Sequence, residues 1–242
     1  TDPMKLALFT GRDQSQALTG WWATQFGTPN FAAHGGFCSV NMAAAGLYTF
    51  GGSFWEFGEP DWDRTKYFLL FGVAEDHASN PIKTGLGKLK KNGAKIVSIN
   101  PVKSGYSAIA DEWVGIRPGT DGLFVGALVH QLLKAGKIDL DYLARYTNAG
   151  HLVIRNPGGE DDGLIARDRY GKVLVLDQKS QKPVPLDKAD QVALHGEVKL
   201  PGKGKRMGVP SFQFVAERYL SDEYSAEKAA AHCGLEAATI ER

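Results

Sequence analysis

Cysteine is scarce in this chain of 242 residues: only Cys38 and Cys233 are present, and they lie far apart. A disulfide framework and a paired-cysteine metal knuckle are therefore excluded. The 28 basic and 27 acidic residues leave a formal net charge of +1, so electrostatics favour neither nucleic acid nor an anionic membrane surface as a partner. No apolar run approaches the roughly 20 residues of a membrane span. This segment carries no signal peptide, so we expect a soluble chain with no direct membrane insertion.

The common phosphate-binding signatures are also missing. The chain contains neither a GxGxxG fingerprint nor a Walker loop. The segment from Gly72 to His77 does place a glycine directly after an apolar run, a position compatible with a phosphate or a ribose. A nicotinamide-type or P-loop enzyme is therefore disfavoured.

Apolar runs and helical patterns alternate up to about residue 154. The apolar runs predict short strands, and the one at 67–72 is unbroken, which is typical of a strand buried on both faces. This rhythm predicts an α/β fold, with a Rossmann-like parallel sheet of about four to six strands flanked by helices. We expect strands at 5–10, 67–72, 95–99 and 113–116, and helices at 15–27, 80–92, 121–135, 211–220 and 225–242.

The composition divides the chain into three parts. Residues 5–154 are expected to form a cofactor-binding domain, and residues 211–242 a helical segment that completes it. Residues 155–210 are rich in Gly, Pro, Lys and Asp, a composition that predicts a peripheral insertion, with disorder as the alternative. We expect a small hairpin around Arg169-Tyr170-Gly171, and we expect limited proteolysis to cleave the chain first within this insertion. The helical pattern continues to the last residue, so we expect a truncated piece of a longer polypeptide.

Ligands of parallel α/β folds bind beyond the carboxyl ends of the strands. Asp121 opens a predicted helix there, and its carboxylate can accept from a guanine edge or a ribose hydroxyl, or act as an ordinary helix cap. The loops at these ends supply the expected cofactor-binding residues Gly11, Arg12, Gly72, Val73, Glu75, Asn100, Pro101, Lys103, Pro118, Gly119 and Asp121.

Cys38 lies between a glycine-broken loop that contains His34 and an alanine-rich run that predicts a helix. A thiol just ahead of a helix start is stabilised as the thiolate, the form that binds metals or attacks electrophiles. An inert core cysteine is the alternative, and a surface position is the alternative for His34.

Several segments together resemble the molybdopterin oxidoreductase family of the dimethyl-sulfoxide-reductase type. Their order and spacing, rather than any one of them, carry the resemblance. Where the family usually has Asp-Pro-Arg, this chain has Asn100-Pro101-Val102-Lys103, and the loop after Gly72 is one residue longer than in formate and nitrate members. The matching segments are 97–108, 110–113, 117–121, 145–149 and parts of 224–240, and those around Cys38, at 117–121 and at 145–149 are most similar to the branch that acts on sulfur and arsenic oxyanions.

The resemblance implies a central domain of the catalytic subunit of a bacterial molybdenum oxidoreductase. In such enzymes the residue at Cys38 ligates molybdenum or tungsten, which two molybdopterin guanine dinucleotides also hold through sulfur. It further implies that His34 moves protons near the metal and that a 4Fe-4S cluster lies in a missing N-terminal part. Electrons would pass to an iron–sulfur subunit, and a membrane anchor subunit would complete the complex. The complete protein would lie on the cytoplasmic or the periplasmic side of a bacterial membrane, and its substrate would be a small oxyanion. The isolated piece would be inactive.

Two rival interpretations remain at this point. A stand-alone Rossmann-like enzyme with Cys38 as its nucleophile predicts thiol-dependent activity without metal. A non-enzymatic nucleotide-binding module predicts guanine nucleotide binding with Cys38 dispensable.

Overall fold

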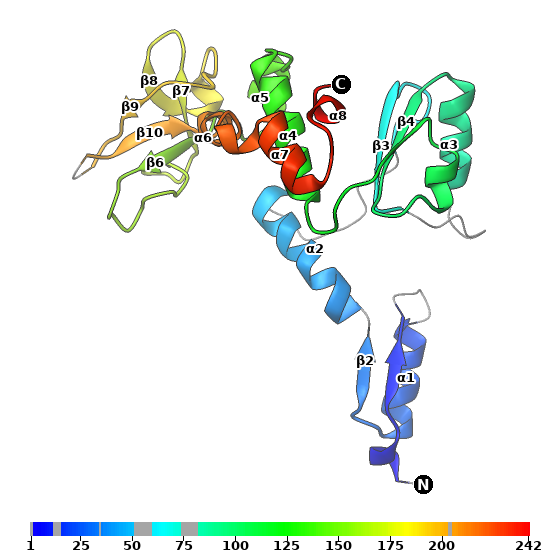
Figure 1. Cartoon of the computed structure of the whole chain (residues 1–242). Helices are drawn as coiled ribbons and strands as arrows, with labels where there is room; N and C mark the ends of the chain where they lie inside the picture. The colour runs from blue at the N-terminus through cyan, green and yellow to red at the C-terminus, as the bar shows by residue number, and fades with distance from the viewer. Residues whose placement is uncertain (1, 12–15, 34, 51–59, 74–81, 203–204) are drawn as a thin grey trace. The chain divides into compact units, whose positions relative to one another are not determined.

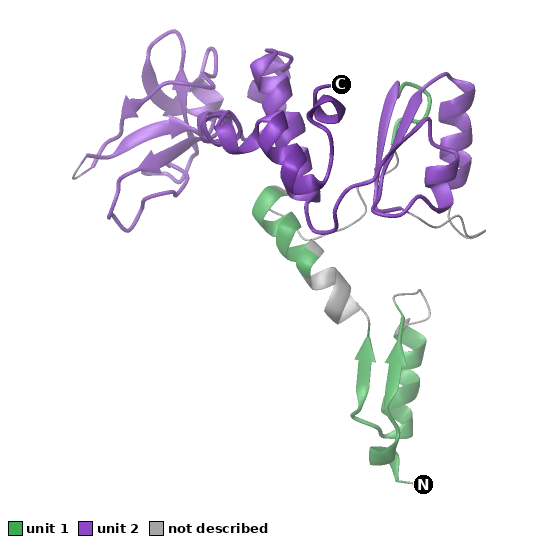
Figure 2. Ribbon diagram, in the orientation of Figure 1, with its two compact units in different colours: residues 1–64 green, residues 65–242 purple. Residues whose placement is uncertain are grey.

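The computed structural model describes residues 2–11, 16–33, 35–50, 60–73, 82–202 and 205–242 (Figure 1). It divides into two compact units, residues 1–64 and residues 65–242 (Figure 2). Both units contain parallel strands and helices, which confirms the predicted α/β class. The predicted single sheet of four to six strands is not found, because the parallel strands of the described part form one pair and one separate sheet of three.

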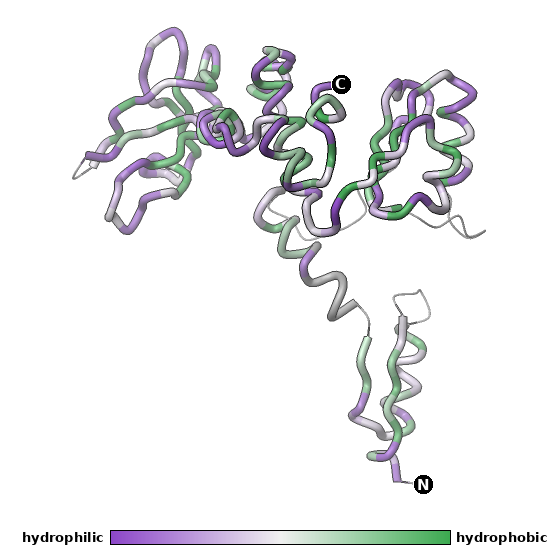
Figure 3. Tube along the Cα trace, in the orientation of Figure 1, coloured by the Kyte–Doolittle hydropathy of each residue, from purple (hydrophilic) through white to green (hydrophobic). Residues whose placement is uncertain are grey.

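The first unit begins with a βαβ motif. Strand β1 (Leu8–Thr10) pairs in parallel with β2 (Phe31–Ala33), and helix α1 (Gln16–Phe26) connects them. Helix α1 packs close to the pair at Gly20, where a Cβ would lie 3.5 Å from the ring of Phe31, an ordinary contact distance. The apolar segments of this motif appear green in Figure 3.

Helix α2 (Gly35–Phe50) follows β2 and corrects one detail of the prediction. Cys38 is the fourth residue of this helix instead of preceding it, because the helix already begins at the Gly35-Gly36 pair. The residue nevertheless belongs to the first turn, where the positive end of the helix dipole acts.

The second unit opens with a three-stranded parallel sheet. Its order is β3 (Tyr67–Phe71), β4 (Lys95–Ile99) and β5 (Glu112–Val114), and helix α3 (Ile82–Lys91) connects the first two strands. The central strand β4 is buried over residues 96–99, as predicted. The predicted burial of β3 on both faces is wrong: Tyr67 is 53% exposed, since this strand lies at the edge of the described sheet.

Helices continue this unit, and three of them, α4, α7 and α8, share an apolar cluster with β4 and β5. Glycine with positive φ ends α4 at Gly136, as predicted. It also ends α7 at Gly234, with φ of 73°, so the helix predicted to run from 225 to the last residue is broken in two. The helices are α4 (Asp121–Lys134), α5 (Leu140–Tyr146), α6 (Ser211–Tyr219), α7 (Ala226–Cys233) and α8 (Ala237–Glu241). Short 3-10 turns lie at Pro3–Lys5, Gly105–Ala108, Leu186–Lys188 and Asp222–Tyr224.

Residues 152–210 form antiparallel structure with an apolar cluster of its own, so disorder is not what the structure shows. The predicted turn is present, with the N–H of Gly171 donating to the carbonyl of Asp168 at 3.0 Å. A second hairpin, β7–β8, was not predicted. The strands are β6 (Leu152–Arg155), β7 (Leu174–Asp177), β8 (Lys182–Pro185), β9 (Val198–Lys199) and β10 (Met207–Pro210), paired in the orders β6-β10-β9 and β7-β8.

The buried carboxylate of Asp177 links the β7–β8 hairpin to the loop at residues 190–191 through hydrogen bonds. It accepts hydrogen bonds from the Ser180 hydroxyl at 2.6 Å and the Ser180 N–H at 2.8 Å, and from the N–H groups of Asp190 and Gln191 at 3.1 Å. These hydrogen bonds lower the pKa of Asp177 to about 2, and the bond from the Ser180 hydroxyl has the largest effect. Since the ionised form is the one that is bound, this stabilisation is complete above the unfolded pKa near 4 and is lost as the pH falls toward 2.

We therefore expect the Asp177→Asn variant to be less stable than wild type at pH 7, with the difference shrinking between pH 5 and pH 2. Urea unfolding at several pH values, followed by circular dichroism, measures this. Asp141→Asn is the matched control, because Asp141 is exposed and has no hydrogen-bond partner among the described residues. A stability difference that does not change with pH would show that the carboxylate charge is unimportant.

Candidate functional site

The carboxyl ends of β3 and β4 lie side by side and carry the first predicted site residues. Phe71 pairs with Ile99, and the N–H of Gly72 donates to the carbonyl of Ile99 at 3.0 Å. Gly72 has a positive φ of 66°, and a Cβ built on it would meet nothing within 4 Å. Gly72 therefore leaves backbone at this edge open to the close approach of a ligand, and Val73 follows it directly.

Asn100 follows β4 and is only 5% exposed. Its N–H donates to the carbonyl of Val114 at 3.1 Å, and its carbonyl accepts from the Trp113 indole N–H at 2.8 Å. Its side-chain Oδ1 accepts from the N–H of Val102 at 3.3 Å. The remaining atom, Nδ2, is buried without a hydrogen-bond partner among the described residues.

The loop that follows Asn100 returns to the protein surface. Pro101, Val102 and Lys103 are exposed, and Lys103 forms no ion pair in the described part of the chain. This loop thus places one buried amide and one cation next to the edge formed by β3 and β4.

The third loop joins β5 to α4 through a tight turn. The N–H of Thr120 donates to the carbonyl of Arg117 at 3.3 Å, with Pro118 and Gly119 between them. Gly119 has φ of 82°, the conformation that type II turns require at this position. The Thr120 hydroxyl bonds the same carbonyl at 2.7 Å, so it does not cap α4.

Asp121 is the first residue of α4, and its carboxylate is exposed and without a hydrogen-bond partner among the described residues. The sequence left open whether this side chain is a plain helix cap. The structure gives the cap position to Thr120, which makes no capping bond, so the N–H groups of the first turn and the Asp121 carboxylate are both free for a ligand.

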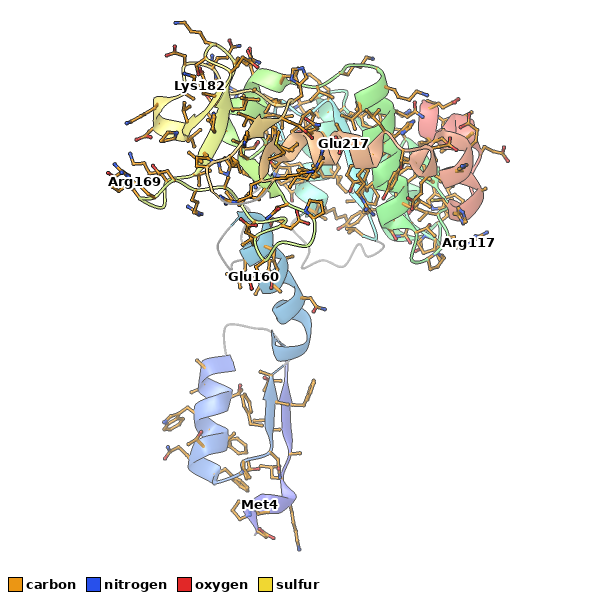
Figure 4. All side chains as sticks on the ribbon, turned by 90° about the vertical axis from the view of Figure 1, so that its left-hand side faces the viewer. Met4, Arg117, Glu160, Arg169, Lys182 and Glu217 are labelled. Atoms are coloured by element: carbon orange, nitrogen blue, oxygen red, sulfur yellow. The ribbon has the colours of Figure 1, made fainter. Side chains whose placement is uncertain are left out.

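The sequence did not predict that the side chains of Trp113 and Arg117 stabilise the loops that follow β4 and β5. Trp113 fixes the Asn100 loop through the indole bond described above. Arg117, labelled in Figure 4, ties the turn to the end of α7: its guanidinium donates to the carbonyl of His232 at 2.7 Å, and its N–H donates to that of Cys233 at 2.9 Å. The contacts of Trp113 and of Arg117 each join segments that are separated in the sequence, so the local sequence does not predict them.

A pocket of about 490 Å³ lies beside the start of α4 and is lined by Gly119, Thr120, Leu123, Glu223, Lys228 and His232. A larger cleft of about 710 Å³ lies between α5, α6 and the loop at 190–195, and it contains none of the predicted site residues. The smaller pocket is the one relevant to the predicted site, because it touches the turn that carries Gly119.

The structure therefore places Gly72, Val73, Asn100, Pro101 and Lys103 directly after the neighbouring strands β3 and β4, and Pro118, Gly119 and Asp121 in the loop that leads from β5 into α4. Gly11 follows β1 in the other unit, and Cys38 belongs to α2 of that unit. Arg12, His34 and Glu75 lie outside the described residues, as does the side chain of Cys38. In the part of the chain that the structure describes, no group of three His, Cys, Asp or Glu side chains is placed to hold a metal ion.

The family model for molybdopterin oxidoreductases matches residues 15–233. The chain belongs to this family. Membership implies a molybdenum–molybdopterin cofactor, and the resemblance found in the sequence is confirmed.

The chain is 48% identical to one subunit of the sulfite dehydrogenase of Allochromatium vinosum over 253 aligned positions, which cover all of this chain and 26% of that protein. It is 33% identical to the thiosulfate reductase molybdopterin-containing subunit PhsA of Salmonella typhimurium over 134 positions, covering 52% of this chain and 16% of that protein. The chain thus spans about a quarter or less of these relatives. Acetylene hydratase from Pelobacter acetylenicus has a similar fold, with a TM-score of 0.51, 15% identity, and coverage of 99% of this chain and 24% of that protein.

Three features of the loops that follow the β3-β4-β5 strands are compatible with a bound cofactor. Nδ2 of Asn100 is buried without an acceptor among the described residues, and an unpaired buried donor costs about 1–3 kcal/mol. Gly72 and Gly119 leave space for close approach, and the first turn of α4 offers free N–H groups beside the Asp121 carboxylate. None of the helices in the described ranges is long and apolar enough to cross a membrane.

Proposed function

We propose that this chain binds the guanosine end of a molybdopterin guanine dinucleotide at the carboxyl edge of the β3-β4-β5 sheet and supplies Cys38 as a ligand to the metal. The observation that carries the proposal is the unpaired Nδ2 of Asn100, buried at the end of the central strand. Residues 5–154 would then act as one Rossmann-like cofactor-binding domain, with 155–210 as an insertion and 211–242 completing it.

The residues at this edge have distinct proposed roles. The Asp121 carboxylate accepts hydrogen bonds from guanine N–H groups or a ribose hydroxyl. Gly72, Val73 and Gly119 present backbone to the ligand, and Pro118 fixes the turn before it. Pro101 and Lys103 add contacts at this edge, and Gly11, Arg12 and Glu75 are proposed as further cofactor contacts from the sequence alone.

Cys38 and His34 have proposed roles at the metal. When bound, the molybdenum or tungsten centre would supply two-electron chemistry with oxygen-atom transfer or its hydrated equivalent. The position of Cys38 in the first turn of α2 favours the thiolate that a metal needs. His34 directly precedes this helix in the sequence and would move protons near the metal. The metal-ligand role of Cys38 distinguishes our proposal from an enzyme that uses Cys38 as a nucleophile without metal.

The activity of the complete protein is proposed from its relatives. We propose oxidation or reduction of a small sulfur or arsenic oxyanion, a choice supported by the activities for which sulfite dehydrogenase and thiosulfate reductase are named. We also propose a 4Fe-4S cluster in the same polypeptide and electron transfer to an iron–sulfur subunit, with a membrane anchor subunit beyond it in a bacterial membrane complex.

The Asp121→Ala variant tests the nucleotide site. Loss of a charged hydrogen-bond acceptor should weaken GDP binding by about tenfold or more, because such bonds contribute about 1.5–3 kcal/mol. Isothermal titration of the chain with GDP measures this, and Asp141→Ala is the matched control, since Asp141 also lies exposed in the first turn of a helix. Unchanged GDP affinity in Asp121→Ala would make Asp121 an ordinary helix residue.

A further inference from the structure

A pocket of about 410 Å³ lies among the antiparallel strands and shares no residue with the proposed nucleotide site. Its apolar part includes two buried side chains, those of Leu174 and Leu200, and two prolines of β8, Pro183 and Pro185. Its charged part contains three arginines and one aspartate. The pocket therefore combines an apolar surface with an excess of positive charge.

Two of the charged groups at this pocket are already bound by the protein. Nε of Arg206 lies 2.6 Å from the carboxylate of Asp161 and forms an ion pair with it. The carboxylate of Asp168 accepts hydrogen bonds from the N–H groups of Tyr170 and Lys172, at 2.8 and 2.9 Å. The Asp168 carboxylate thus serves the turn of its own hairpin, and Arg206 is already neutralised.

Arg167 and Arg169 carry the unbalanced charge. Both are exposed, and neither has a carboxylate partner among the described residues. Nη1 of Arg167 donates to the carbonyl of Gly171 at 2.8 Å, and the guanidinium of Arg169 lies over the ring of Tyr170, 4.6 Å from its centre. A guanidinium has five N–H donors, so most of them remain available to an anion. Residues 198–216, part of which line the pocket, contain four basic residues and no acidic one.

This arrangement favours a ligand whose negative charges are spread along a chain. The guanidinium groups of Arg167 and Arg169 are held by different neighbours, a backbone carbonyl and an aromatic ring, rather than by one shared partner. The apolar surface lies beside them, and Tyr170 is 72% exposed. Tyr and Arg are among the side chains that contribute most to binding at protein interfaces. A peptide segment with an apolar side chain between carboxylates matches these features.

The strand beside the pocket limits how such a segment can bind. In the described part of the chain, β8 pairs with β7 alone, so its other side is a sheet edge. Pro183 and Pro185 take up half of this strand and have no N–H to donate to an added strand. The segment would therefore be held through its side chains and not as a further strand of the sheet.

We propose that this pocket binds an acidic segment of a partner protein. An apolar side chain of the segment contacts Leu174, Leu200 and the β8 prolines, and carboxylates on either side of it bind Arg167 and Arg169. The contact goes beyond the proposed function and does not depend on it, because the two sites have no residue in common. Since its ion pairs are exposed, the binding weakens as the salt concentration rises.

Isothermal titration of the chain with the blocked peptide Gly-Asp-Glu-Phe-Glu-Asp-Gly tests the proposal. Wild type should bind this peptide saturably. Arg169→Glu should bind it about fivefold or more weakly, because a repulsion replaces an attraction at an exposed side chain, which Figure 4 labels. Lys188→Glu is the matched control: it makes the same charge reversal at an exposed cation outside the pocket lining and should leave the affinity unchanged.

Two altered peptides test the ligand without changing the protein. Replacing the phenylalanine by alanine removes the apolar contact, and replacing the four acids by their amides removes the charge, so each should bind about fivefold or more weakly. The proposal is wrong if wild type binds no peptide at about 1 mM, or if Arg169→Glu or either altered peptide leaves the affinity unchanged. Binding of wild type to phosphatidylglycerol vesicles, but not to the peptide, would also overturn it and assign these arginines to a lipid surface.

Discussion

The Cys38→Ala variant of the complete protein should lose turnover almost entirely while it keeps most of its molybdopterin. The two properties depend on different parts of the chain. Hydrogen bonds along the edge that holds Asn100 and Asp121 retain the cofactor in our proposal, and none of them involves the thiol. The thiolate sets the coordination and electron density of the metal. Loss of groups that merely orient a metal ligand costs about 10–100-fold, so loss of the ligand itself should cost at least ~100-fold.

Turnover with sulfite and a redox dye, metal content and metal-edge X-ray absorption measure this result together. The chain provides its own control in Cys233, which is fully buried with its sulfur 3.8 Å from the carbonyl of Thr120. Cys233→Ala should retain turnover per folded molecule. Cys38→Ser should fall between wild type and Cys38→Ala, since oxygen also ligates high-valent metals. Unchanged sulfur coordination and surviving activity in Cys38→Ala would make Cys38 a packing residue.

The parts of the fold that sequence predicted well are those fixed by local chemistry. The segment Lys95-Ile96-Val97-Ser98-Ile99 predicted the buried central strand β4, and a glycine stop predicted the end of α4 at Gly136. The loops that follow the strands were predicted to form one site, and those after β3 and β4 do begin side by side. Parallel pairing alone brings such loops together, so periodicity was sufficient.

The β7–β8 hairpin shows where local chemistry gave no signal. Its turn contains no glycine, proline or asparagine: the left-handed position is taken by Gln181, with φ of 54°. Few residues other than glycine adopt this conformation, so the segment lacked the glycine that would have predicted a turn with a left-handed position. The bonds of Asp177 to Ser180, Asp190 and Gln191 stabilise it instead.

The hydrogen bonding of Asn100 was equally beyond the sequence. Whether its amide is paired depends on Val102, Trp113 and Val114, and two of these three reach it only through the register of β4 against β5. The sequence showed a residue able to donate and to accept. Only the structure shows which of these capacities is already used.

The Ile99→Ala and Leu152→Ala variants should each lower the free energy of unfolding by about 2–5 kcal/mol, the usual cost of deleting a fully buried aliphatic side chain. Both residues are 0% exposed, but they belong to separate apolar clusters. Ile99 lies beside Asn100 at the end of β4, whereas Leu152 lies in β6 among the antiparallel strands. A cavity at Ile99 allows the end of β4 to relax, so we expect weaker GDP binding in this variant and unchanged binding in Leu152→Ala.

Urea unfolding followed by circular dichroism gives the stabilities, and GDP titration under folding conditions gives the affinities. The pair is matched in chemistry and burial, so a difference in GDP affinity reports position alone. If Leu152→Ala weakened GDP binding as much as Ile99→Ala, the two clusters would be energetically coupled. The strands that pack around Leu152 would then be part of the framework that supports the nucleotide edge.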